Sequence, residues 1–179
     1  MFGLFRKKDA SPAITDKVVI GESAKWDALL DAWDKNKNSV LVFWFEESLR
    51  QAEDYFRNKT GDPVPLLLVR EVLSPQRAGR ELLFAEHYPL RSKEEELYRA
   101  LDLEKVTVYS SLREPLFRQF GGEKIIQLMQ QLGMKEDEVI GHSMISKAIR
   151  QAQEKIEQQT PIDLSARSQE DWIRNNYKP

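Results

Sequence analysis

The chain has 179 residues and a formal net charge of −2, with 41% hydrophobic and 31% charged residues. This length suits one domain with a proper core, and the near-neutral charge excludes the broad electrostatic attraction of basic chains to nucleic acid. Cysteine is absent, which excludes disulfides, thiolate metal sites and cysteine nucleophiles and is compatible with the cytoplasm. With two histidines as well, we expect no metal site and no cofactor.

The first 16 residues are predicted to form a flexible tail, in which residues 11–16 resemble a linker. The tail opens with apolar residues followed by cations, and its apolar part is too short for a signal-peptide core. We favour a frayed terminus. The alternative is weak contact with a membrane surface, which would use Phe2, Leu4, Phe5, Arg6, Lys7 and Lys8.

Alternating strands and helices are predicted along residues 17–157. Continuous apolar runs are typical of strands covered on both faces, and they occur at residues 40–45, 66–69, 82–85 and 106–109. Apolar positions at helical spacing predict helices at residues 24–34, 48–58, 92–101, 123–132 and 144–159, with a short helical segment after Glu114. Ser23 and Ser92 are the expected N-caps. This alternation predicts an α/β domain with a mainly parallel sheet between helices.

Two parts of the chain leave alternatives open. Residues 70–81 link the second and third predicted strands, and we favour a compact parallel crossover there over an antiparallel connection. Residues 158–179 are predicted to be a polar tail. Within this tail, Trp172 and Tyr177 either dock onto the chain or anchor a partner.

An irregular series of short motifs fills the stretch from Val106 to Glu157. In order they are Tyr109-Ser110-Ser111-Leu112, Leu116-Phe117-Arg118, Phe120-Gly121, Lys124-Ile125, Leu132-Gly133-Met134, His142, Met144-Ile145-Ser146-Lys147-Ala148-Ile149 and Ala152-Gln153-Glu154-Lys155-Ile156-Glu157. The series resembles the end of the motor domain of SecA, the ATPase that drives preproteins through the bacterial Sec translocon. A weaker match begins at Lys25 and Ala28, so the resemblance covers one motor lobe and implies a three-layer RecA-like fold with a C-terminal helical extension.

The parts that such a motor uses for catalysis are missing from the sequence. The phosphate-loop pattern G-x-x-x-x-G-K-[ST] does not occur. The family's arginine segment is replaced by residues 86–96, which lack its arginine pattern. Gln76-Arg77-Ala78-Gly79-Arg80 resembles a shortened form of it but lies one structural unit too early, and we interpret it as a solvated loop. We therefore expect a P-loop NTPase-like fold without ATPase activity.

Two groups of candidate site residues follow. Ligands of open α/β sheets bind beyond the carboxyl ends of strands, which makes ligand-crevice candidates of Glu46, Arg70, Glu86, His87 and Ser110. Glu86 and His87 also form a possible acid–base pair, although helix capping and surface charge are the favoured interpretation. The partner-binding candidates are Arg118, Lys147, Arg150, Trp172 and Tyr177.

The favoured function is a non-catalytic, SecA-related module that binds a protein, with translocase components as expected partners. We expect it in the cytoplasm or at the periphery of the inner membrane. The alternative is a regulatory domain that binds a small ligand or nucleotide in the strand-end crevice.

Overall fold

The computed structural model describes residues 11–72, 79–141 and 143–178. The predicted membrane contact at Phe2 to Lys8 therefore lies outside the described residues, as do Gln76 to Ala78 and His142. None of the described helices is long and apolar enough to cross a bilayer.

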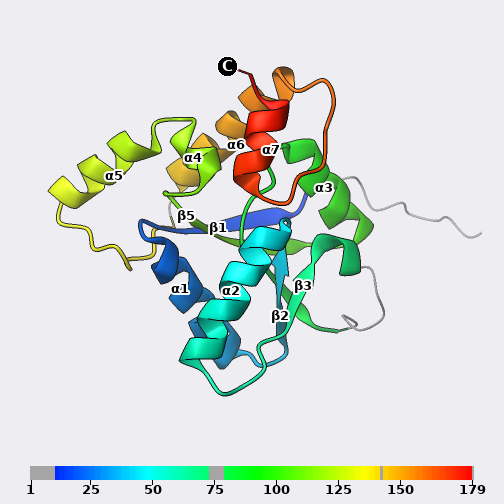
Figure 1. Ribbon diagram of the computed structural model, residues 1–179, viewed down its shortest axis with the longest axis vertical. Coiled ribbons are helices and arrows are strands. Elements are labelled where there is room, and N and C mark those ends of the chain that lie inside the picture. The colour runs from blue at the N-terminus through cyan, green and yellow to red at the C-terminus, as the bar shows by residue number, and fades with distance from the viewer. Residues whose placement is uncertain (1–10, 73–78, 142, 179) are drawn as a thin grey trace, which may run out of the picture.

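Five parallel strands form one sheet at the centre of the molecule (Figure 1). The strands are β1 (Ala13–Val19), β2 (Ser39–Phe43), β3 (Leu66–Leu68), β4 (Glu81–Phe84) and β5 (Lys105–Ser111), and their order is β1-β5-β4-β2-β3. The four predicted strands are confirmed. The β3–β4 link is a parallel crossover, as predicted, because both strands pair in parallel with β2 between them.

Strand β1 corrects the predicted linker at residues 11–16. It pairs with β5 from Ala13, opposite Lys105, to Val19, opposite Ser111. The predicted boundary after residue 16 therefore falls inside a strand. Periodicity missed β1 because its middle residues, Thr15, Asp16 and Lys17, are polar and its first three residues are exposed or half-buried, as is usual for a strand at the edge of a sheet.

The helices cover both faces of the sheet, as predicted for an α/β fold. They are α1 (Glu22–Lys35), α2 (Glu46–Lys59), α3 (Arg91–Ala100), α4 (Pro115–Arg118), α5 (Gly122–Gln131), α6 (Ser143–Gln158) and α7 (Gln169–Asn176), with a 3₁₀ turn η1 at Val69–Glu71. Trp26 and Trp33 of α1 and Phe56 of α2 pack on one face, and Tyr98 of α3 packs on the other. This architecture is consistent with a three-layer RecA-like fold.

The predicted caps are wrong at two helices. Helix α1 starts after Gly21 and α3 after Leu90, and neither start has a side-chain cap, so Ser23 and Ser92 lie within the first turns. Pro115 does occupy the first turn of α4, as expected from its fixed φ.

The C-terminal residues are not a free tail. Helix α7 begins after Ser168, whose hydroxyl accepts a hydrogen bond from the backbone N–H of Asp171. Figure 1 shows α7 beyond the carboxyl end of the sheet. Its Trp172 is fully buried in an apolar cluster with Phe45, Leu90, Leu116, Ile156 and Ile173. Docking onto the chain is therefore the correct alternative for Trp172, and its predicted role as an exposed partner anchor is wrong.

Candidate functional site

The sheet has a switch point between its neighbouring strands β2 and β4. After β2 the chain turns to the face that α2 covers, and after β4 it turns to the opposite face, which α3 covers. Such a divergence opens a crevice beyond the carboxyl ends of the two strands, which is the usual ligand position in open α/β sheets.

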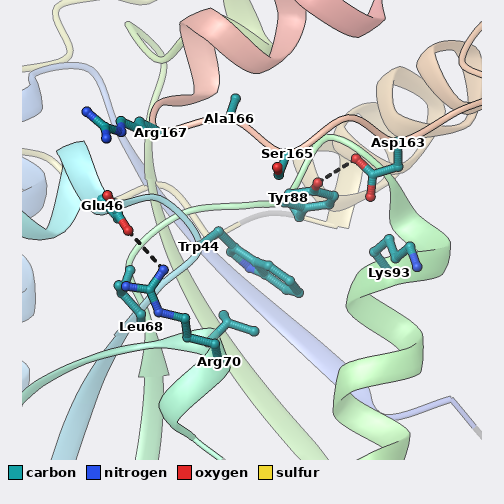
Figure 2. Close-up of a pocket in the computed structure, with 11 residues that line it drawn as sticks. Trp44, Glu46, Leu68, Arg70, Tyr88, Lys93, Asp163, Ser165, Ala166 and Arg167 are labelled. Carbon is teal, nitrogen blue, oxygen red and sulfur yellow. Dashed lines mark hydrogen bonds and ion pairs between the residues drawn. The ribbon is translucent and has the colours of Figure 1, made fainter.

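A pocket of about 660 Å³ lies at this position (Figure 2). We call it the switch-point pocket. It is bounded by the residues after β2, β3 and β4, by the start of α3 and by the segment before α7. Its lining comprises Trp44, Glu46, Leu68, Val69, Arg70, Tyr88, Lys93, Asp163, Ser165, Ala166 and Arg167.

Three internal contacts fix the walls of the switch-point pocket. The Arg70 guanidinium lies 2.9 Å from the Glu46 carboxylate, and this hydrogen bond lowers the pKa of Glu46. Asp163 accepts hydrogen bonds from the hydroxyl of Tyr88 at 2.7 Å and the indole of Trp172 at 2.8 Å. Burial, followed by the bond to Asp163, raises the pKa of Tyr88, so this hydroxyl remains a donor.

Glu86 faces a different cavity. Its carboxylate is buried and accepts hydrogen bonds from the backbone N–H groups of Trp44 and Phe45, at 3.0 Å each, and from the hydroxyl of Ser48 at 2.6 Å. Burial raises the pKa of Glu86 to about 7, against the opposing effect of Lys25. Glu86 therefore ties the end of β4 to the start of α2.

Lys25 and Glu114 form a buried ion pair beside Glu86. The Lys25 ammonium lies 2.7 Å from the Glu114 carboxylate, which also accepts from the backbone N–H of Ser111 at 3.0 Å. The pair borders a cavity of about 300 Å³ that Glu86 also lines. The charge of the Lys25 ammonium is therefore already neutralised within the protein.

His87 is the centre of a third cluster, at the opposite side of the sheet end. Its two ring nitrogens each lie 2.9 Å from a carboxylate, Nδ1 from Glu94 and Nε2 from Asp16. Burial opposes the charged ring, but the two carboxylates outweigh it and raise the pKa of His87 to about 10. The ring is therefore protonated at neutral pH and donates on both sides. Gln153 of α6 completes the cluster by donating to Glu94 at 2.9 Å.

The predicted crevice residues are thus distributed over separate places. Glu46 and Arg70 share the switch-point pocket, whereas Glu86 and His87 line two other cavities. The side chains of Glu86 and His87 belong to different hydrogen-bond clusters, which argues against the acid–base pair. Ser110 is fully buried.

The partner-binding candidates also lie at different places in the fold. Lys147 and Arg150 lie exposed on α6. Arg118 pairs with Glu170 and so joins α4 to α7. Tyr177 is half-buried, with its ring 6.3 Å from that of Phe120.

Sequence reasoning missed several residues of the switch-point pocket. Trp44 lay inside a predicted strand, but β2 ends at Phe43 and places the next side chain at the crevice. Tyr88 directly follows the candidates Glu86 and His87 at the same strand end but was not chosen as a candidate. Lys93 lies a few residues further on, so the strand-end rule applied over a wider window would have included it. Asp163 and Arg167 gave no signal, because their role depends on the docking of α7.

Comparison with known proteins gives a partial relationship. The chain is 54% identical over 50 residues to protein translocase subunit SecA of Christiangramia forsetii, which is 28% of this chain and 4% of that protein. With SecA of Chlorobium phaeovibrioides it shares 35% identity over 88 residues, 47% of this chain and 9% of the relative.

The chain is homologous to SecA over part of its length. SecA of Acinetobacter baumannii gives the same result, with 45% identity over 49 residues, 27% of this chain and 5% of the relative. The matches thus span less than a tenth of these SecA proteins. No protein-family profile matches the chain.

Proposed function

We propose that this protein is a non-catalytic accessory module of protein translocation, which binds a component of the translocase. The observation that carries the proposal is the partial similarity to SecA, on a fold that is consistent with one motor lobe. The module would act in the cytoplasm, at the periphery of the inner membrane, with its N-terminal residues in weak contact with the membrane surface.

The electrostatics of the strand ends support a role without hydrolysis. A P-loop motor holds the β- and γ-phosphates with backbone N–H groups and a lysine that are free to meet them. Here the buried Lys25 is bonded to Glu114, and the N–H groups of Trp44 and Phe45 are bonded to Glu86. Together with the missing phosphate-loop pattern, this supports an interaction module.

We place the partner surface on the exposed side of α6, around Lys147 and Arg150. This helix belongs to the stretch that resembles SecA most closely in sequence. The two cations are exposed and lie on the outside of a helix whose Ile149 and Ile156 are buried, so both are accessible to a partner.

The proposal is tested by binding of the purified chain to purified SecA from the same organism, measured by biolayer interferometry. We expect saturable binding that falls at least tenfold in the double variant Lys147→Glu/Arg150→Glu. Arg50→Glu/Arg57→Glu is the matched control, because both arginines are exposed on α2 and the charge change is the same. Equal loss in the two variants would contradict the proposed surface, and absence of saturable binding would contradict SecA as the partner.

The proposed lack of ATPase activity is tested by a separate measurement. We expect the purified chain alone to release phosphate from ATP at no more than the background rate. Turnover above background that is lost on Arg80→Ala would show that the short arginine motif is catalytic and would overturn this part of the proposal.

A further inference from the structure

We propose that the switch-point pocket binds a small organic anion in which a flat ring carries a phosphate or carboxylate group. This inference goes beyond the accessory role and does not depend on it. Its basis is the position of the pocket, its aromatic wall and its surplus of cations.

The position and the size of the pocket both suit a small ligand. It opens beyond β2 and β4, where the chain diverges to opposite faces of the sheet. Its volume of about 660 Å³ falls within the range of about 300 to 1,000 Å³ that is usual for small-molecule sites. The cavities beside Glu86 and His87 are smaller, at about 300 and 330 Å³, and their buried charges are already paired.

The aromatic wall is held firmly in place. The rings of Trp44 and Tyr88 lie 4.8 Å apart between centroids, and Tyr88 also packs against Phe45 and Trp172, each at 5.7 Å. The bond from Tyr88 to Asp163 fixes the same ring at its far end (Figure 2). Because the wall is fixed before a ligand arrives, a flat ring can stack on it at a low cost in side-chain entropy.

The charges around the pocket favour an anion. Three cations, Arg70, Lys93 and Arg167, face two carboxylates, Glu46 and Asp163, which leaves a net charge of +1. Both carboxylates are engaged within the protein, Glu46 by Arg70 and Asp163 by the Tyr88 hydroxyl and the Trp172 indole.

Lys93 is the cation best placed to meet a ligand. Its ion pair with Glu96, at 3.4 Å, is exposed and therefore weak, so the ammonium can turn to a ligand at little cost. It lies in the first turn of α3, where the helix dipole also favours negative charge. In Figure 2, Lys93 and Arg70 lie on opposite sides of Trp44, so a ring on this wall would have a cation at either end.

The test follows the indole signals of ¹⁵N-labelled protein by NMR, with Trp44 assigned through Trp44→Phe. The probes are adenosine 5′-monophosphate, which joins a ring to a phosphate, indole-3-acetate, which joins a ring to a carboxylate, and inorganic phosphate, which has no ring. We expect at least one ring-bearing probe to shift the Trp44 signal to saturation, with a dissociation constant at least tenfold below that of phosphate.

Two variants and one control locate the binding. Lys93→Glu and Trp44→Leu should each raise the dissociation constant at least tenfold, while Lys124→Glu on α5, away from the pocket, should leave it within twofold. Circular dichroism and the melting temperature confirm that each variant is folded. For Trp44→Leu, whose own signal is lost, calorimetric titration replaces NMR.

Three outcomes would overturn the inference. These are no saturable shift with either ring-bearing probe, unchanged affinity in Lys93→Glu, and phosphate binding as tightly as the ring-bearing probes. None of them bears on SecA binding through α6, so the two proposals fail separately.

Discussion

At the residue scale, the charged side chains at the strand ends are chiefly structural. Glu86 is the clearest case, because one carboxylate accepts from two backbone N–H groups and a hydroxyl in a buried position. Buried polar groups that are fully bonded specify local geometry, and here they fix how α2 leaves the sheet.

Glu86 should make stability depend on pH. Its pKa is about 7 in the folded protein and about 4.5 in the unfolded chain, so the folded state holds the proton more tightly. Its contribution is fully present below pH 4.5 and is lost as the pH rises through 7. We expect Glu86→Gln to remove this loss, because the amide keeps an acceptor for the N–H groups and a donor for Ser48.

The measurement is urea unfolding of both proteins at intervals from pH 4.5 to 8.5. As the pH rises across this range, the free energy of unfolding of the variant should increase relative to that of the wild type by on the order of 1 to 3 kcal/mol. Glu47→Gln, at an exposed carboxylate in the first turn of α2, controls for the loss of one negative charge. A stability difference that stays constant with pH would show that Glu86 does not titrate in this window.

At the scale of elements, the His87 cluster joins parts of the chain that are distant in sequence. The imidazolium follows β4 and binds Asp16 of β1 and Glu94 of α3, while Gln153 of α6 binds Glu94. Four elements therefore depend on one buried cation, which places α3 and α6 relative to the edge strand.

Removal of that cation should be costly. His87→Ala leaves the two carboxylates of Asp16 and Glu94 buried without the imidazolium between them, and we expect a loss of about 3 to 5 kcal/mol in the free energy of unfolding. Arg99→Ala, an exposed cation on α3, should cost less than about 0.5 kcal/mol. Urea unfolding at pH 7 compares the two variants, and similar small losses would contradict the structural role of His87.

The sequence predicted the elements that have strong apolar patterns. Strands β2, β4 and β5 and helices α1 and α2 are covered by apolar neighbours, so their patterns are continuous or regular. Strand β1 and helix α7 escaped prediction for the opposite reason. The first is a partly exposed edge strand, and the second has only Trp172 and Ile173 as buried apolar side chains.

The candidate site was only partly predictable for a similar reason. The rule that ligands bind at strand ends correctly placed Glu46 and Arg70 at the pocket. It could not place Asp163, which meets Tyr88 from 75 positions away in the chain. Contacts of this kind depend on the docking of the C-terminal segment, which no local pattern encodes.

At the scale of the whole molecule, the C-terminal segment completes both the core and the pocket. Trp172 and Ile173 close the apolar cluster at the carboxyl end of the sheet, while Asp163 and Arg167 line the switch-point pocket. Gln169 adds two buried hydrogen bonds, to the carbonyl of His87 at 3.0 Å and from the N–H of Leu116 at 2.7 Å. We therefore expect the domain and its C-terminal segment to unfold as one unit.

Deletion of residues 161–179 should weaken the entire fold. It exposes the apolar surface that Trp172 and Ile173 cover and leaves Tyr88 without its acceptor, so we expect a loss of at least about 3 kcal/mol, in the range of a buried tryptophan removed from a core. Far-ultraviolet circular dichroism and tryptophan fluorescence should give one shared urea midpoint for the full chain and a lower shared midpoint for the truncated chain. Arg174→Ala, an exposed change on α7, should leave the midpoint in place. An unchanged midpoint after the deletion would mean that the rest of the chain folds without its C-terminal segment.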